Sequence, residues 1–270
     1  MEESQEIKLF ASDLDGTLIP VDESPDPQQL REFHDLIQSR SEFTLAYVTG
    51  RHFELALAGL ALAGLPVPHY LVCDVGTSIY RSLSPLADKF DPSSWRPMES
   101  YSRQLSRLWD KNAVEVVEDT LLKINGVSLQ EGEKQGNYKR SFYCTELSRE
   151  LKEALAPWRE RLCVVESFAV DSHYALIDLL PRGVNKLYAV RFILEELQMS
   201  PLEAVYAGDS GNDIALFESE MHGIVVGNAH QEVKAAVLAN NWEGGENYIA
   251  RGKTIAGVLE GLQYFGVRGG

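Results

Sequence analysis

The feature that most constrains the fold is an alternation of short apolar runs and helical patterns in the first third of the chain. Apolar runs at 7–11, 43–48 and 70–73 have the length of strands buried in a sheet. Between them, helical patterns at 27–39 and 52–64 are bounded by proline, glycine and an Asp-Pro start signal. The order strand, helix, strand, helix, strand predicts a parallel sheet with right-handed crossovers.

The pattern changes in the middle of the chain. Residues 84–97 are rich in Pro, Ser and Asp, and helical patterns follow at 99–110 and 146–157. Strand-like runs are mixed with these helices, near 114–117, 141–144, 163–165 and 174–180. Such a mixture predicts a small α+β domain inserted at 83–181.

Beyond Pro181 the first pattern returns. The predicted elements are a helix with an apolar face from Leu187 to Leu197, strands at 204–207 and 223–226, and helices at 214–219, 231–239 and 255–265. We therefore expect an α/β fold. Its Rossmann-like parallel-sheet core comprises residues 1–82 and 182–270, and the α+β domain lies between the two parts.

Two carboxylates follow the first predicted strand. Asp13 and Asp15 stand two residues apart, directly before Gly16. Ligands of open α/β sheets bind beyond the carboxyl ends of the strands. Two acids placed there repel each other, and a divalent cation bound by oxygen ligands is the simplest compensation. Taken alone, the stretch also fits an ordinary Asp-Gly turn.

Three further sites favour the chemical interpretation. Thr49 follows the second strand, Lys186 opens a helix, and Asp209 and Asp213 follow the strand at 204–207. Such a set suits phosphoryl transfer. One carboxylate attacks phosphorus and a second moves the proton of the leaving alcohol. A hydroxyl, an ammonium and a metal ion stabilise the phosphoryl oxygens.

Each of these residues also has an ordinary structural interpretation. Thr49 fits a helix N-cap, and Lys186 fits a solvated surface lysine. The stretch 208–213 fits a polar loop. Arg51 fits a surface ion pair as readily as a substrate contact.

The four sites together resemble the motifs of the haloacid dehalogenase (HAD) superfamily of phosphatases. The matching stretches are Asp13-Leu14-Asp15-Gly16-Thr17, Thr49-Gly50-Arg51, Lys186 and Gly208-Asp209-Ser210-Gly211-Asn212-Asp213. The resemblance covers nearly the whole chain, and an insert between the second and third motifs is typical of members with a C2-type cap. It implies a cap domain that closes over the site and excludes water.

The resemblance also implies roles for individual residues. Asp13 would be the nucleophile and a Mg²⁺ ligand, and Asp15 the general acid and base, with its carbonyl on the metal. Thr49 and Lys186 would bind the phosphoryl group, together with Gly50 and Arg51 of the same motif. Asp209 would be a metal ligand, and Asp213 would complete the metal site. Asn212 would help to order the metal site and contact the substrate.

Within the superfamily, several stretches resemble sucrose-phosphate phosphatases. They are residues 74–80, 139–143, 178–181 and 257–265. Tyr80, Lys139 and Ser141 are the cap contacts that this resemblance suggests. Sucrose-phosphate phosphatases often carry Asn where this chain has Gly16. The resemblance implies hydrolysis of a sugar phosphate, with sucrose 6-phosphate as the first expectation, through an aspartyl-phosphate on Asp13.

Other functions stay open. Phosphatases of glucosyl- or mannosyl-phosphoglycerate and of mannosylfructose phosphate share the expected core. A mutase related to phosphomannomutase would need an activating bisphosphate. A non-catalytic sugar-phosphate sensor is an alternative of another class, although such a module could lose Asp13 or Asp15, and this chain keeps both. Functional coupling to a glycosyltransferase synthase is a further expectation.

Charge and composition limit the partners. The chain has 40 acidic and 25 basic residues, a formal net charge of −15, which argues against general nucleic-acid binding. An anionic substrate must therefore be attracted locally, by a metal ion or a few cations.

The location is predicted from three features. Residues 1–6 lack the basic and apolar parts of a signal peptide. The apolar stretch 55–65 is too short to span a bilayer, so no membrane association is expected. Cys73, Cys144 and Cys163 show no metal-ligand spacing and predict reduced thiols in a cytoplasmic protein.

Overall fold

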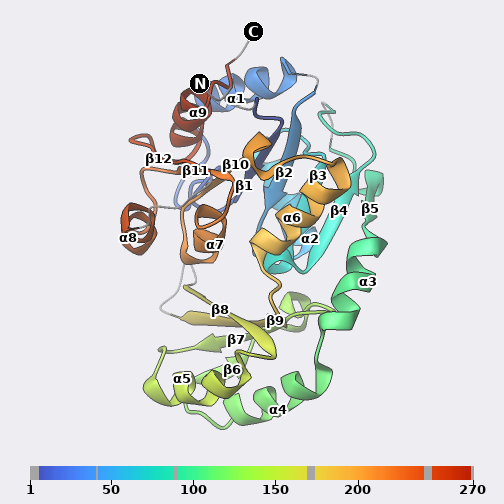
Figure 1. The fold of residues 1–270 in the computed structure, drawn as a ribbon, viewed down its shortest axis with the longest axis vertical. Helices are drawn as coiled ribbons and strands as arrows, with labels where there is room; N and C mark the ends of the chain where they lie inside the picture. Colours follow the sequence, from blue (N-terminus) through green and yellow to red (C-terminus); the bar gives the residue numbers. More distant parts are fainter. Residues whose placement is uncertain (1–5, 41, 88–89, 169–173, 240–244, 269–270) are drawn as a thin grey trace.

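The computed structural model describes residues 6–40, 42–87, 90–168, 174–239 and 245–268. These residues form two β-sheets, each packed on its own hydrophobic cluster (Figure 1). The expectation that residues 1–6 form no signal peptide falls almost wholly outside the described part of the chain. Among the described residues, no helix combines the length and apolarity needed to cross a bilayer.

The large sheet confirms the predicted α/β fold. Its strand order is β12-β11-β10-β1-β2-β3-β4-β5, and the six strands from β12 to β3 are parallel. The strands are β1 (Leu9–Ser12), β2 (Thr44–Val48), β3 (Tyr70–Cys73), β4 (Ser78–Ser82), β5 (Trp95–Pro97), β10 (Ala204–Gly208), β11 (His222–Val225) and β12 (Asn247–Ile249). Every residue of β1, β2, β3 and β10 is buried, which is why these strands read as continuous apolar runs.

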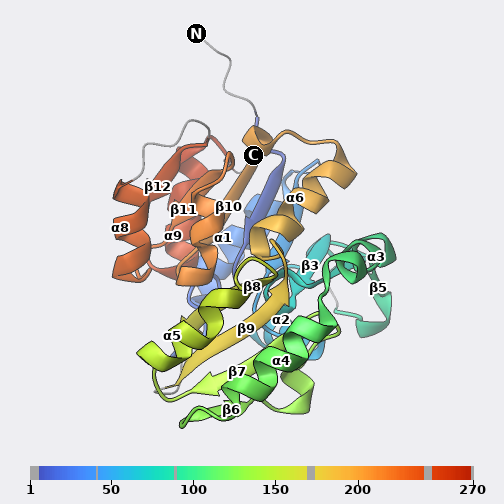
Figure 2. The same ribbon diagram turned by 60° about the horizontal axis from the view of Figure 1, so that its bottom comes forward.

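Helices cover both faces of this sheet (Figure 2). They are α1 (Pro27–Gln38), α2 (Phe53–Ala63), α6 (Lys186–Leu197), α7 (Ile214–Phe217), α8 (Gln231–Ala239) and α9 (Thr254–Tyr264). From β1 the chain winds outward in opposite directions, through β2 and β3 and later through β10 to β12. Right-handed crossovers therefore place α1 and α2 on one face and α7 and α8 on the other, and α6 packs against α7. Helix α9 returns to contact α1.

The small sheet is antiparallel, in the order β6-β7-β9-β8. Its strands are β6 (Val127–Leu129), β7 (Arg140–Cys144), β8 (Leu162–Phe168) and β9 (Ala175–Pro181). Helices α4 (Lys111–Leu121) and α5 (Arg149–Leu155) pack on one face, with their own cluster that includes Phe142, Ile177 and Leu179. The other face is turned toward the large sheet (Figure 1). We call residues 111–181 the cap.

One predicted strand of the cap is wrong. Residues 114–117 lie inside helix α4. Val114, Val117 and Leu121 are buried at helical spacing, and the Asp110 side chain caps the helix by accepting a hydrogen bond from the backbone N–H of Ala113 at 3.0 Å. A short run with valines at both ends is typical of a strand, but the N-cap residue Asp110 that precedes it favours a helix.

The large sheet also continues beyond the expected boundary at residue 82. Strand β5 pairs with β4, and Tyr101 and Leu105 of α3 (Glu99–Leu108) belong to the hydrophobic cluster of the large sheet. We therefore propose that the inserted domain begins after α3, and that it ends with β9 as expected.

Candidate active site

Three of the predicted site residues follow neighbouring strands at the same edge of the large sheet. Asp13 follows β1, Thr49 follows β2 and Asp209 follows β10. The register explains why they meet, because Ser12 is paired with Tyr47 on one side and with Ala207 on the other. The carboxyl ends of the three strands are therefore level.

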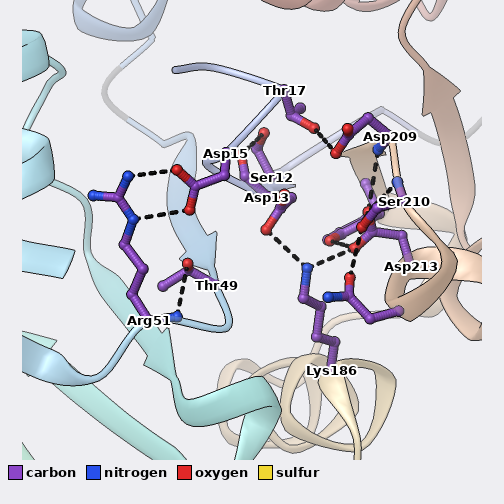
Figure 3. A network of polar contacts seen from close by, with 12 residues as sticks. Ser12, Asp13, Asp15, Thr17, Thr49, Arg51, Lys186, Asp209, Ser210 and Asp213 are labelled. Atoms are coloured by element: carbon purple, nitrogen blue, oxygen red, sulfur yellow. Dashed lines mark hydrogen bonds and ion pairs between the residues drawn. The ribbon is translucent and has the colours of Figure 1, made fainter. Parts of the chain in front are cut away.

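Lys186 lies at the centre of the site (Figure 3). It is the first residue of α6, which Asn185 caps by accepting a hydrogen bond from the Tyr188 N–H. Its side chain is 1 % exposed, and its ammonium lies 2.8 Å from Asp13 Oδ1 and 2.7 Å from Asp213 Oδ1. Burial alone would lower the Lys186 pKa, but the two carboxylates outweigh burial and raise the pKa above its usual value. Lys186 is therefore not a solvated surface lysine.

Asp213 is surrounded by donors. Besides Lys186, its Oδ1 accepts a hydrogen bond from the hydroxyl of Tyr206 at 2.5 Å. Its Oδ2 accepts from the backbone N–H groups of Asp209 and Ser210, both at 3.1 Å. These contacts suit a group that fixes the loop and the lysine, and they leave little of the carboxylate for another ligand.

Asp13 and Asp209 lack such compensation. Burial raises the pKa of Asp13 well above its usual value, and Lys186 only partly opposes the shift. Burial, and then the charge of Asp213, raise the pKa of Asp209 to about 7. An oxygen from each of Asp13, Asp209 and Asp213 lies within 4.8 Å of the others.

These residues fit a divalent cation. Three buried carboxylates face one ammonium, which leaves an excess of two negative charges in the ionised state. Carboxylate oxygens are the ligands that Mg²⁺ prefers, and a cation would offset the repulsion that raises both pKa values. The carboxylate of Asp15 is not part of this group, and the metal ligand expected from that residue is its backbone carbonyl.

Asp15 is instead held by Arg51. The guanidinium approaches the carboxylate with two nitrogens, Nε donating to Oδ2 at 2.8 Å and Nη2 to Oδ1 (Figure 3). Arg51 in turn lies over Gly59 of α2, where a Cβ atom would come within 2.0 Å of Nη1. Thr49, buried beside them, accepts a hydrogen bond from the Arg51 N–H at 3.2 Å. Arg51 is therefore an ion-pair partner of a site residue.

Close packing in the site also explains why residue 16 is a glycine. It has a φ of 78°, and a Cβ atom there would lie 2.3 Å from Asp209 Oδ2. Its carbonyl accepts a hydrogen bond from the Asn228 side chain at 2.6 Å. The Asp209 side chain itself accepts from Thr17 at 3.2 Å. With Asp209 in this position, glycine is the residue that fits.

A cavity of about 780 Å³ lies over these residues, between the core and the cap. The core contributes Asp13, Asp15, Gly50, Arg51, Asp209 and Asn212, and the cap contributes Gln130, Lys134, Lys139, Tyr143, Glu166, Leu176 and Asp178. The alternation of side chains along a strand explains which residues of β9 line the cavity. Leu176 and Asp178 face the cavity, while Ile177 between them packs in the hydrophobic cluster of the cap. The volume suits a ligand of disaccharide size.

The cap residues suggested from the sequence lie in three different positions. Lys139 lines the cavity and is paired with Asp74 of the core at 2.9 Å. Ser141 is fully buried beneath the surface and donates a hydrogen bond to Asp178. Tyr80 does not line the cavity: its ring stacks on Phe53, with centroids 3.9 Å apart. The structure therefore does not bring Tyr80 to the site.

Sequence reasoning missed Tyr206, Gly59 and Asp74. Tyr206 is a lone aromatic residue in a parallel strand of small and apolar residues, which is the one local signal for its role. Gly59 is a glycine inside an otherwise strongly helix-forming segment. For Asp74, the signals were its position directly after β3 and its place in the stretch 74–80, which resembles sucrose-phosphate phosphatases.

Comparison with known proteins agrees with this geometry. The chain is 32% identical over 272 residues to a HAD-like hydrolase of Nitrosococcus oceani, covering 95% of this chain and 71% of that protein. It is 26% identical to a mannosylfructose-phosphate phosphatase of Agrobacterium fabrum, covering 97% and 98%. It is 27% identical to a glucosylglycerol-phosphate synthase of Pseudomonas anguilliseptica, covering 97% of this chain and 31% of that protein.

A solved structure of similar size shares the architecture. The sucrose-phosphatase of Synechocystis, in complex with sucrose and phosphate, superposes with a TM-score of 0.78 at 27% identity, covering 97% of this chain and 99% of that one. Finally, the family model for sucrose-6F-phosphate phosphohydrolase matches residues 6–266. The chain is thus a phosphatase of the HAD superfamily and belongs to the sucrose-6F-phosphate phosphohydrolase family.

Proposed function

We propose that this phosphatase is Mg²⁺-dependent and hydrolyses the phosphate monoester of a small glycoside, with sucrose 6-phosphate as the first candidate. The observation that carries the proposal is the buried group of Asp13, Asp209 and Asp213 around Lys186, of which Asp13 and Asp209 line the floor of a cavity roofed by the cap. A charged phosphoryl group belongs at this floor, and an uncharged sugar belongs nearer the cap.

Asp13 and Asp209 would hold the metal ion, together with the backbone carbonyl of Asp15. When bound, the ion neutralises the charge that accumulates on the phosphoryl oxygens. Asp213 would act through its neighbours, since its oxygens already accept from Lys186, Tyr206 and two backbone N–H groups. Asn212, which accepts from Ser210 at 3.1 Å, would help to order the same loop.

The reaction would run in two steps on the side chains of the core. In the first, an oxygen of Asp13 bonds to phosphorus while the bond from phosphorus to the sugar oxygen breaks, and Asp15 gives its proton to the leaving alkoxide. In the second, Asp15 takes a proton from water as the water oxygen bonds to phosphorus. The acyl phosphate then breaks and restores the Asp13 carboxylate.

Lys186 and Thr49 would hold the phosphoryl oxygens during both steps. The Lys186 ammonium already faces Asp13. The Thr49 oxygen accepts from the Arg51 N–H, so its own proton is available to donate to the substrate. Arg51 would orient Asp15 through its two-nitrogen contact and would have to loosen when Asp15 transfers its proton.

The cap favours an uncharged leaving group. Of its two lysines at the cavity, Lys134 is paired with Glu131 at 3.2 Å and Lys139 with Asp74 at 2.9 Å. A glycerate carboxylate would need a cation that is not already compensated. These ion pairs therefore support a neutral sugar over glucosyl- or mannosyl-phosphoglycerate. Mannosylfructose phosphate stays the second candidate, because the relative of that name matches this chain over 98% of its own length.

Initial rates on a panel of esters test the proposal. The panel contains sucrose 6-phosphate, mannosylfructose 6-phosphate, glucosylphosphoglycerate and glucose 6-phosphate, each assayed with Mg²⁺ and with a chelator. We expect kcat/KM to be highest for one of the two disaccharide phosphates and to vanish with the chelator. Turnover of no glycosyl phosphate would refute the substrate class, and full activity with the chelator would refute the metal requirement.

Two smaller proposals concern the setting of the enzyme. The match to 31% of a glucosylglycerol-phosphate synthase supports coupling between this kind of module and a glycosyltransferase. A pull-down with the synthase that makes the preferred ester tests the coupling. Cys73, Cys144 and Cys163 are free thiols, which supports the predicted cytoplasmic location.

A further inference from the structure

An ion pair joins the core to the cap beside the cavity. Lys139 Nζ lies 2.9 Å from Asp74 Oδ1, and the two side chains are only 4% and 13% exposed. Asp74 follows β3 of the core, and Lys139 precedes β7 of the cap. The turn that presents Lys139 also comes close to the Asp74 side chain, because a Cβ atom on Gly136 would lie 3.8 Å from Asp74 Cγ.

The backbone that presents Asp74 is unusual. Asp74, Val75 and Gly76 have φ values of 54°, 58° and 98° in succession. A β-branched residue with positive φ is a genuine outlier, and such strain persists only where the surrounding structure imposes it. This conformation directs the Asp74 side chain to the cap, where it meets Lys139.

The same loop is fastened to the catalytic residues. The backbone N–H of Asp74 donates to the carbonyl of Arg51 at 2.9 Å, and that of Val75 donates to the carbonyl of Thr49 at 3.2 Å. On the other side, the hydroxyl of Tyr101 donates to the carbonyl of Gly76 at 2.5 Å. Gly76 lies against Asn185 and Lys186, since a Cβ atom there would be 2.3 Å from the Asn185 carbonyl oxygen.

The charges explain why the pair matters. Lys139 is a buried cation, and a second acidic residue that interacts with it electrostatically is Asp178 of the cap. Burial raises the pKa of Asp178, and Lys139 opposes this shift. Asp178 of the cap compensates the charge of Lys139 only in part, and Asp74 supplies the rest of the negative charge. Asp74 can do so only when the cap lies against the core.

We propose that Asp74 is a positioning residue that holds the cap over the active site by its ion pair with Lys139. Through the loop 74–76, the position of the cap is tied to Thr49 and Arg51 beneath it. The pair also fixes the Lys139 ammonium at the wall of the cavity, beside the place of the leaving sugar.

The distance between core and cap tests this directly and without any substrate. Spin labels are placed on Leu62→Cys of α2, which is 91% exposed, and on Glu115→Cys of α4, in a Cys163→Ser background. Asp74→Asn is the test variant, because asparagine tolerates positive φ and removes only the charge. Glu118→Gln is the matched control, since it breaks the pair with Arg140, 2.8 Å long and adjacent in sequence to Lys139 but wholly inside the cap.

We expect Asp74→Asn to lengthen and broaden the distance distribution, while Glu118→Gln keeps that of the parent. Lys139→Gln must reproduce the effect, and the double variant Asp74→Asn/Lys139→Gln must add nothing to it. The proposal would be overturned by any of three results: an unchanged distance distribution in Asp74→Asn, equal broadening in Glu118→Gln, or effects of the two single variants that add up in the double variant. Lys139→Gln gives the same comparison if Asp74→Asn does not fold.

A kinetic measurement adds a readout that rests on the proposed function. Asp74→Asn should raise KM for the preferred sugar phosphate roughly tenfold and change kcat on p-nitrophenyl phosphate less than about twofold. An equal loss on both substrates would mean that the core is damaged and would count against a positioning role. If no sugar phosphate is turned over at all, the proposed function fails. The distances between the spin labels still test whether Asp74 holds the cap in place.

Discussion

The ammonium of Lys186 lies 2.8 Å from the carboxylate of Asp13, although 173 positions separate the two residues in the chain. Asp13 follows the first strand of the core, and Lys186 begins the first helix after the cap. The contact therefore joins the two segments of the core that precede and follow the inserted domain in the sequence. It also places the Lys186 ammonium between the predicted nucleophile Asp13 and the buried carboxylate of Asp213.

Replacement of this lysine should affect both stability and catalysis. Lys186→Met leaves three buried carboxylates without their cation, so we expect the metal-free protein to lose about 3–5 kcal/mol of unfolding free energy. Chemical unfolding in the presence of a chelator measures the loss. Lys8→Met, which removes an exposed pair with Glu203, is the control and should unfold like the parent. Equal unfolding curves for the two variants would contradict the central position of Lys186.

The stabilising effect of Mg²⁺ should grow with pH. Burial and Asp213 raise the pKa of Asp209 to about 7, whereas an unfolded aspartate titrates near 4. In the metal-free protein, the stability that protonated Asp209 contributes is complete below about pH 4 and is lost as the pH rises through about 7. Mg²⁺ binds the ionised form, so its effect on Tm should be small at about pH 5.5 and large at about pH 8.

Thermal unfolding with and without Mg²⁺ across this pH range checks the prediction. Asp209→Asn serves as the control and should lose most of the Mg²⁺-dependent rise at every pH. A rise in Tm that is the same at both ends of the range would show that Asp209 does not take part in metal binding.

Loss of the Tyr206 hydroxyl should loosen the position of Lys186. Tyr206→Phe removes a donor to Asp213 at 2.5 Å in a fully buried position, which should cost about 1–2 kcal/mol of stability. Because Asp213 also holds Lys186, we expect kcat to fall roughly tenfold with KM little changed. Tyr47→Phe is a matched control in strand β2, since the buried Tyr47 hydroxyl has no hydrogen-bond partner among the described residues. A similar loss in both variants would argue against a specific role for Tyr206.

Gly59→Ala should separate activity from stability. Alanine favours the helical conformation of α2 by about 1 kcal/mol, but its Cβ would come within 2.0 Å of Arg51 Nη1. The flexible arginine can move aside, so we expect a stability close to that of the parent. The contact of Arg51 with Asp15 would be lost, and kcat should fall roughly tenfold.

Kinetics and thermal unfolding of Gly59→Ala are compared with those of Gly132→Ala. Gly132 lies in a cap turn with open space around its Cα, so it tests the effect of the added methyl group alone. Parent-like kcat in Gly59→Ala would show that the position of Arg51 does not matter for Asp15.

Local patterns were enough to predict the floor of the site. Strands that are buried on both faces read as apolar runs, so the polar residues Asp13, Thr49 and Asp209 stood out at their ends. Parallel pairing then made their meeting a consequence of the strand order. Lys186, at the start of a predicted helix, and Asp213, in the stretch after the strand at 204–207, were singled out in the same way, and the family resemblance then implied their roles.

Other contacts depend on distant packing that no local pattern contains. The pairing of Asp74 with Lys139 requires the cap, which has a hydrophobic cluster of its own, to lie against the core. The contact of Arg51 with Asp15 depends on the space above Gly59. Tyr80 was expected at the sugar because of its neighbours in sequence, but stacking on Phe53 takes its ring away from the cavity.

Chemical trapping of the phosphorylated enzyme tests the central claim most directly. The enzyme is quenched in acid during turnover of the preferred sugar phosphate and is then reduced with borohydride, which converts an aspartyl phosphate to homoserine. We predict homoserine at position 13 by peptide mass spectrometry, and none in Asp13→Asn or in enzyme without substrate. Homoserine at another aspartate, or its absence while phosphate is released at the full rate, would contradict the assignment of Asp13 as the nucleophile.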